Sequence, residues 1–103
     1  MDEKEILQKI KNLLGMGTNT ANDDILLDLI NVVKLDMFDS GVSKSVINSQ
    51  SAIGTIVRGV IDNWNYGSGA NYSTMYINGV IKLRAKGEDN TTLNNEEEIE
   101  NEV

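Results

Sequence analysis

The sequence contains no cysteine, no histidine and no proline. Without cysteine, disulfides and thiolate chemistry are excluded. Without histidine, the chain lacks the usual general base and the commonest zinc ligand. The absence of proline favours helices that continue without a break. We therefore expect no enzyme activity, no cofactor and no metal site, and a protein that works by binding other proteins.

Long hydrophobic runs are also missing. No window approaches the roughly 18 consecutive apolar residues of a membrane-spanning helix, and the charged start, Met1 to Glu5, is unlike a secretory signal. We expect no membrane contact and a protein that stays in the compartment where it is made. A chain of 103 residues is one domain, and its stability alone is marginal, so a partner covering apolar surface would change its energetics appreciably.

Charge is distributed unevenly along the chain. The net charge is −7, from 9 bases and 16 acids, and no base follows Lys86. Seven of the acids lie beyond Gly87: Glu88, Asp89, Glu96, Glu97, Glu98, Glu100 and Glu102. Residues 1–87 therefore carry 9 acids and 9 bases and are neutral. Because phosphate binding needs a basic surface, duplex DNA is excluded as the main ligand.

Apolar residues recur with helical period in three segments: 2–14, about 20–40 and about 50–66. Gly15 and Gly41 are natural stops after the first two, and Thr20 with Asp23 resembles a capping box at the start of the second. The second segment is apolar around most of its circumference, which predicts a helix that is central or covered by a neighbour. In the third, Gly54 and Gly59 are tolerable where another backbone passes close by.

Two segments are less regular. Residues 41–50 predict a polar connection with weak local structure. Residues 72–86 fit two interpretations: Asn78-Gly79 between apolar pairs is typical of a hairpin, whereas the apolar spacing and a capping Ser73 favour a helix. The acidic residues 88–103 hold few large apolar groups, which predicts disorder in the unbound chain. The sequence thus predicts an all-α domain over 1–87, with three main helices plus a short C-terminal helix or hairpin, and a flexible tail over 88–103.

Two clusters are candidates for a binding surface. Four of the five aromatic residues fall close together around a glycine turn: Trp64, Tyr66, Tyr72 and Tyr76. They are either core residues or part of an interface, where Trp and Tyr are frequent anchors. Three bases, Lys82, Arg84 and Lys86, precede the acidic tail. They either form a solvated helix end or dock onto an acidic partner or a neighbouring copy's tail.

The order of segments resembles a known family. A short helix ending in Leu13-Leu14-Gly15 precedes the apolar run 23–30, the segment 52–67 follows with Trp64-Asn65-Tyr66 at its end, and the segments 72–76 and 80–84 close the chain. Over residues 4–86 this pattern resembles the head–tail connector, or head completion, proteins of tailed bacteriophages. None of the matching motifs is catalytic.

The resemblance implies a helical bundle that forms a ring of roughly a dozen copies under the portal. Such a ring extends the DNA channel, through which genomic DNA passes without specific binding, and docks the next neck or tail protein. It implies a place at the head–tail junction of the virion, after assembly in the bacterial cytoplasm. It also favours a helix over 72–86 and a contact of Lys82, Arg84 and Lys86 with the portal or a neighbouring subunit.

A second hypothesis is a small cytoplasmic helical regulator or antitoxin-like adaptor whose acidic tail mimics nucleic acid. On that hypothesis, deleting residues 88–103 abolishes partner binding, whereas a connector retains partial assembly.

Overall fold

The computed structural model describes residues 3–67 and 72–97, and side chains as far as Gly87. The elements in this part are α1 (Glu3–Leu13), α2 (Asp23–Asp39), α3 (Lys44–Ile47), the 3-10 helix η1 (Gln50–Ala52), α4 (Ile53–Tyr66) and α5 (Thr74–Glu97). No strand occurs within the described ranges, so the predicted all-α class is confirmed. The three main helices lie where the apolar periodicity places them.

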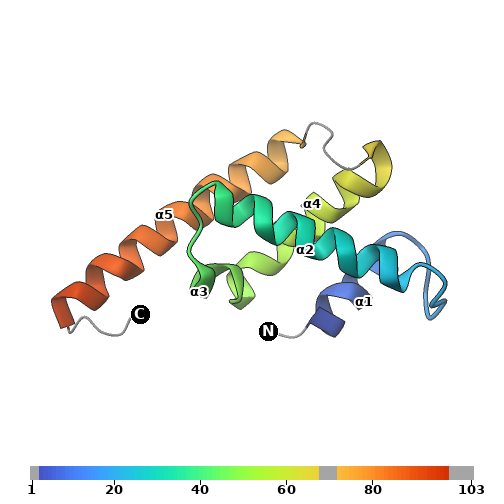
Figure 1. Ribbon diagram of the computed structural model, residues 1–103, viewed down its shortest axis with the longest axis horizontal. Coiled ribbons are helices and arrows are strands. Elements are labelled where there is room, and N and C mark those ends of the chain that lie inside the picture. Colours follow the sequence, from blue (N-terminus) through green and yellow to red (C-terminus); the bar gives the residue numbers. More distant parts are fainter. Residues whose placement is uncertain (1–2, 68–71, 98–103) are drawn as a thin grey trace.

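Helix α4 is the centre of the fold. It packs against α1, α2 and α5, while α3 connects α2 to the C-terminal half of the bundle (Figure 1). Each helix contributes one apolar face to a single core: Ile6, Ile10, Leu26, Ile30, Val33, Met37, Val42, Val46, Ile47, Ala52, Ile53, Ile56, Val57, Val60, Tyr76, Val80 and Leu83. Burial of each large aliphatic side chain contributes about 1.5–3 kcal/mol.

The first two helices end at glycines as predicted. Gly15 has φ +76° and Gly41 has φ +101°, in the left-handed region that favours glycine. After α1 the amide of Met16 donates to the carbonyl of Lys11, and after α2 the amide of Val42 donates to that of Met37. These are the hydrogen bonds of a Schellman motif, which satisfies carbonyls at a helix end.

The start of α2 differs from the prediction. Its N-cap is Asn22, whose side chain makes no capping hydrogen bond, so the capping box of Thr20 and Asp23 is wrong. Asp23 instead lies beside Lys11, with Nζ 2.9 Å from Oδ1. That oxygen has no partner that meets hydrogen-bond geometry in the described part of the chain, so the contact is an ion pair. Because Lys11 is buried, the pair joins α1 to α2 inside the fold.

The connection 41–50 is more ordered than expected. Ser43 accepts a hydrogen bond from the amide of Val46 and caps α3. Val42, Val46 and Ile47 are buried in the core. Val42 precedes the N-cap Ser43, whereas Val46 and Ile47 lie within α3 itself. A segment this short shows too little periodicity for a prediction. Its order comes from packing of α3 against α2 and α5.

The segment 72–86 is helical, so the hairpin alternative is wrong. Ser73 caps α5 as the helical interpretation requires, since its Oγ accepts a hydrogen bond from the amide of Tyr76 at 3.2 Å. Gly79, the glycine of the hairpin signal, lies against Thr55 of α4. Tertiary packing thus overrides a local turn preference, because α5 buries Tyr76, Val80 and Leu83 along one face.

Helix α5 is also longer than the predicted short helix, with 24 residues ending at Glu97. It continues through 88–97, inside the segment we expect to be flexible, and residues 98–103 lie outside the described part. Elongation adds one hydrogen bond for each residue ordered, and no proline interrupts it. As Figure 1 shows, the C-terminal part of α5 extends past α3, beyond the rest of the bundle.

Close contact between helices depends on Gly59 of α4. A Cβ atom there would lie 2.7 Å from Cε1 of Tyr76 and 2.9 Å from Cγ1 of Val33, so only glycine fits between α2 and α5. Gly54, on the same helix, meets no atom within 4 Å. The predicted close approach of another backbone is therefore wrong at both glycines: side chains of Tyr76 and Val33 approach Gly59, and nothing approaches Gly54.

These two glycines make a matched pair for a stability test. We expect Gly59→Ala to lower the free energy of unfolding by about 1–3 kcal/mol, because the added methyl overpacks the core. Gly54→Ala should raise it by roughly 0.5–1 kcal/mol, because alanine has the higher helix propensity and open space around it. Urea unfolding followed by circular dichroism measures both. Equal effects of the two substitutions would contradict the packing of α4 against α5.

Candidate interaction surfaces

A polar cluster lies between α2, α4 and α5. The hydroxyl of Tyr76 donates to Oδ2 of Asp36 at 2.7 Å. The ring of Tyr72 stacks on that of Tyr76, with centroids 4.2 Å apart. Asn63 donates from Nδ2 to the Tyr72 hydroxyl at 3.0 Å and to the carbonyl of Gly59 at 2.9 Å. These bonds satisfy polar groups that helix packing removes from water.

Both tyrosines of this cluster remain neutral phenols. Burial raises the pKa of Tyr76 strongly, and its hydrogen bond to Asp36 raises it further. Burial also raises the pKa of Tyr72, against the opposite effect of its hydrogen bond with Asn63. A raised pKa means that the proton is held more tightly. The two hydroxyls therefore hold helices together.

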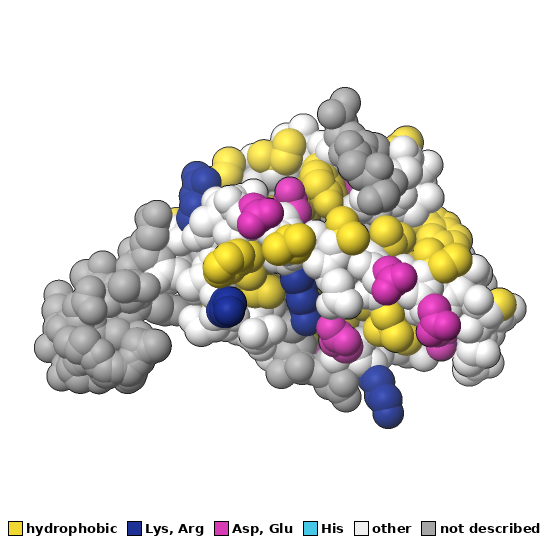
Figure 2. All heavy atoms as spheres, in the orientation of Figure 1, with side chains coloured by type: hydrophobic (Ala, Val, Ile, Leu, Met, Phe, Trp, Pro, Cys, Tyr) yellow, Lys and Arg dark blue, Asp and Glu magenta, His cyan; other side chains and the backbone are white. Residues whose placement is uncertain are grey.

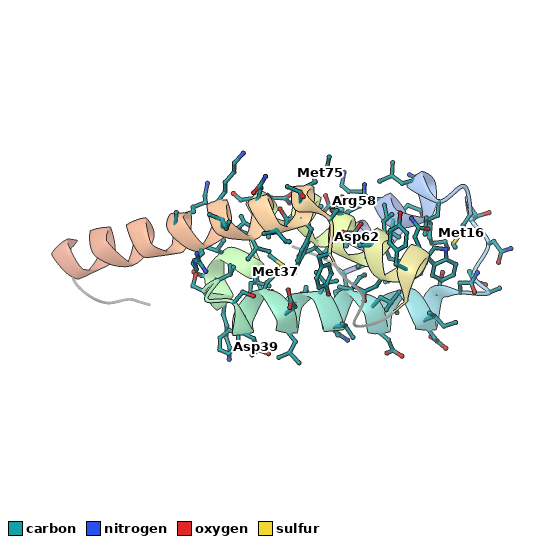
Figure 3. The ribbon with its side chains drawn as sticks, turned by 90° about the horizontal axis from the view of Figure 1, so that it is seen from above. Met16, Met37, Asp39, Arg58, Asp62 and Met75 are labelled. Carbon is teal, nitrogen blue, oxygen red and sulfur yellow. The ribbon has the colours of Figure 1, made fainter. Side chains whose placement is uncertain are left out.

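Asp62 joins the end of α4 to the start of α5. Its side chain is buried, Oδ2 accepts a hydrogen bond from the amide of Ser73 at 3.0 Å, and Nη2 of Arg58 lies 3.3 Å from Oδ1. In Figure 3 Arg58 and Asp62 lie side by side on α4 next to the first turn of α5. The carboxylate of Asp62 also lies at the N-terminus of α5, where the positive end of the helix dipole stabilises a negative charge.

The predicted aromatic cluster is divided by the structure. Tyr72 and Tyr76 belong to the internal network, and Trp64 is partly buried against the core. Tyr66 alone is largely exposed, at 72% of its surface. Of the four, Tyr66 and the outer edge of Trp64 remain available for a partner.

The three predicted bases lie on the outside of α5. Lys82 and Lys86 are exposed. Arg84 is exposed too, but its Nη1 donates to the carbonyl of Ser40 at 3.2 Å. At the C-terminus of α2, this cation satisfies a helix-end carbonyl and is stabilised by the negative end of the helix dipole. Arg84 thus supports the contact between α2 and α5, and Lys82 and Lys86 are the bases that point to solvent.

The largest set of exposed apolar side chains on one helix, among the residues described, was not among the predicted site residues. Helix α2 buries four side chains on its inner face and leaves four others 39–61% exposed: Ile25, Val32, Leu35 and Phe38. In Figure 2 hydrophobic side chains run along the face that α2 presents, interspersed with acidic and basic ones. The sequence already indicated this set, because the segment is apolar around most of its circumference. That pattern predicts a helix covered on all sides, whereas the single chain covers only one side of α2.

Two hollows lie beside the C-terminal half of α2. The first, between α2 and α5, has a volume of about 490 Å³, and its lining includes Asp36, Ile77, Ile81 and Arg84. The second, which we name the α2–α3 hollow, has a volume of about 440 Å³ and is lined by Lys34, Leu35, Phe38, Lys44, Ile47 and Asn48. In it, Nζ of Lys44 lies 5.6 Å from the ring centroid of Phe38, within the range of a cation–π contact.

Two kinds of feature are absent from the part of the chain that the structure describes. No group of three or more side chains able to hold a metal ion occurs there. None of the helices described is both long enough and apolar enough to span a membrane. The chain matches no family model, no curated protein and no solved structure.

The Tyr76–Asp36 hydrogen bond yields a prediction for stability. We expect Tyr76→Phe to lower the free energy of unfolding by about 1–2 kcal/mol, since the substitution removes a hydrogen bond to a charged acceptor. Tyr66→Phe removes the same hydroxyl from an exposed ring and should change it by less than about 0.5 kcal/mol. Urea titrations of both variants measure the difference. A Tyr76→Phe protein as stable as the parent would show that the bond contributes nothing.

The raised pKa of Tyr76 yields a second prediction. In the unfolded chain the phenol loses its proton near the ordinary value of 10.0. In the folded chain it keeps the proton, so above that pH the unfolded state binds fewer protons and stability falls as pH rises. The advantage of the parent over Tyr76→Phe should be complete at about pH 8 and smaller at about pH 11. Urea unfolding at both values measures it; an unchanged advantage would contradict the neutral buried phenol.

Proposed function

We propose that this protein is a structural subunit that assembles with its own copies, and that it serves as a head–tail connector of a tailed bacteriophage. It forms a ring of roughly a dozen copies under the portal protein. The ring continues the DNA channel and gives the next neck or tail protein a surface to dock on. It binds no cofactor and catalyses no reaction.

The observation that carries the proposal is the uncovered side of α2. Leu35 is 61% exposed, Ile25 53%, Phe38 48% and Val32 39%, all on one 17-residue helix. A helix that is apolar on both sides is typical of a buried position. Exposed apolar side chains that gather on one element mark interaction surfaces. Contact between neighbouring copies supplies the missing cover.

Charge and shape support the same proposal. Residues 1–87 have equal numbers of acids and bases, so this body adds no net repulsion between copies and lacks the excess of bases that binding to duplex DNA requires. Helix α5 extends beyond the bundle and can reach a neighbouring protein (Figure 1). The segment order over residues 4–86, with its resemblance to phage connectors, links this assembly to the head–tail junction.

The proposal predicts assembly with a portal protein. The chain alone should sediment as a monomer or weak oligomer, and a ring should appear when it is mixed with the portal protein encoded in the same genome. Ile25→Glu combined with Val32→Glu should suppress the ring while leaving the fold intact, because both side chains are exposed. Negative-stain microscopy and sedimentation velocity measure assembly, and circular dichroism checks the fold.

Leu13→Glu is the control variant. Leu13 is 67% exposed but lies at the end of α1, away from the outer face of α2. The proposal requires that this substitution leave assembly unchanged. Absence of any association between the chain and the portal protein, across salt concentrations, would overturn the connector function.

A further inference from the structure

The α2–α3 hollow combines two kinds of side chain that select a ligand. Its floor is apolar, with Leu35 61% and Phe38 48% exposed. Two lysines, Lys34 and Lys44, line it, and no acidic residue does. Lys34, whose side chain is 19% exposed, donates to Glu3 at 3.5 Å; the side chain of Glu3 is 46% exposed, and so long a contact with a hydrated acid contributes little. A ligand that fits this hollow carries an apolar group between two negative charges.

The other hollows select against such a ligand. Asp36 lines the hollow between α2 and α5, and its one cation, Arg84, already donates to Ser40. The hollow between α1 and α2 is lined by three acids, Glu3, Asp23 and Asp24, and by two lysines, of which Lys11 is already paired with Asp23. Like charges repel, so an acidic segment is disfavoured at both places. A third hollow, between α1 and α4, offers the single base Lys9.

The chain itself contains a segment of the required chemistry. Residues 88–103 hold seven acids and no base. Near its end Ile99 stands between Glu98 and Glu100, an apolar side chain flanked by two carboxylates. We propose that the acidic C-terminal segment of one copy docks into the α2–α3 hollow of a second copy, with Ile99 on Leu35 and Phe38 and its flanking glutamates facing Lys34 and Lys44.

Geometry favours a second copy over the same chain. At Gly87 helix α5 still touches α3, where a Cβ atom would lie 3.0 Å from Oγ of Ser43. The helix then continues to Glu97, about 15 Å further at 1.5 Å per residue, on a course that leaves α3 behind (Figure 1). The described end of the helix therefore lies away from α3 and from the hollow of its own copy (Figure 1).

The inference deepens the proposed function and rests on it in one respect, that the copies associate. It names one contact between them and a cause for its specificity. Opposite charges that meet at a partly exposed contact set partner and register more than affinity, and salt screens them. The docked segment also covers part of the apolar face that α2 leaves open.

Cross-linking tests the contact without background, because the chain contains no cysteine. Full-length Ile99→Cys is mixed with full-length Leu35→Cys under mild oxidation, and disulfide-linked dimers are measured on a non-reducing gel. Leu13→Cys replaces Leu35→Cys as the control, since Leu13 is equally exposed (67%) and lies elsewhere. We expect the yield with Leu35→Cys to exceed the control at least about fivefold, and to fall toward it in high salt. Equal yields would overturn the proposal.

Charge reversal provides a second readout. Lys34→Glu with Lys44→Glu in the Leu35→Cys chain should lower the yield toward the control, as should Glu98→Lys with Glu100→Lys in the Ile99→Cys chain. Mixing the two reversed chains should restore it, because the attraction is then rebuilt with opposite signs. Lys4→Glu with Lys9→Glu makes the same charge change on the exposed side of α1 and should leave the yield unaffected. Failure of the reversed pair to recover would contradict the assigned partners.

A single chain that carries both cysteines separates docking within a copy from docking between copies. At high dilution, rapid closure within one chain would overturn the second-copy assignment, whereas a concentration-dependent dimer supports it. The result is independent of the portal experiment. If rings form with the portal and the cross-link is absent, the docking is wrong and the connector function stands. If the cross-link forms and no ring appears, the docking stands and the connector function is wrong.

Discussion

The fold depends on the place where Tyr76 meets three helices. Its ring, carried by α5, lies against the bare backbone of Gly59 on α4, and its hydroxyl reaches Asp36 on α2. The two requirements are coupled. A side chain at position 59 would push the ring away, and a displaced ring would lose its carboxylate partner while leaving the phenol buried. Buried polar groups tolerate few alternative partners, so this contact restricts the register in which α5 packs.

The rest of the C-terminal half follows from that register. Tyr72 stacks on Tyr76 and accepts a hydrogen bond from Asn63, while Asp62 accepts one from the amide of Ser73, just before α5. Arg84, two turns beyond Tyr76, then meets the C-terminus of α2. These polar groups serve internal structure. The features that remain for contact with other proteins are the outer face of α2, the lysines of α5 and the helix that extends beyond the bundle.

The features that were predictable are those governed by local chemistry. Gly15 and Gly41 end helices because the left-handed backbone after a helix favours glycine, and the sequence shows where they stand. The segment around Asn78 and Gly79 had two consistent local interpretations, and contacts with α4 selected the helix. The order of residues 41–50 comes from packing, which short segments do not reveal. The same limit applied to the predicted site. Tyr72 and Tyr76 are spaced like an interface cluster, but Tyr76 is buried by its contact with α2, and Tyr72 is partly buried and bonded to Asn63 of α4.

The sequence by itself determined the helical class, the positions of the three main helices, the neutral charge of residues 1–87 and the absence of thiol and imidazole chemistry. These properties depend on residue type and on periodicity along one chain. Only the tertiary structure decided which of the two apolar sides of α2 is buried, that Arg84 caps a helix while Lys82 and Lys86 face solvent, and where a hollow combines lysines with exposed apolar side chains. The physical reason is that burial and electrostatic environment are set by neighbours far away in the chain, and periodicity identifies a face without identifying what lies opposite it.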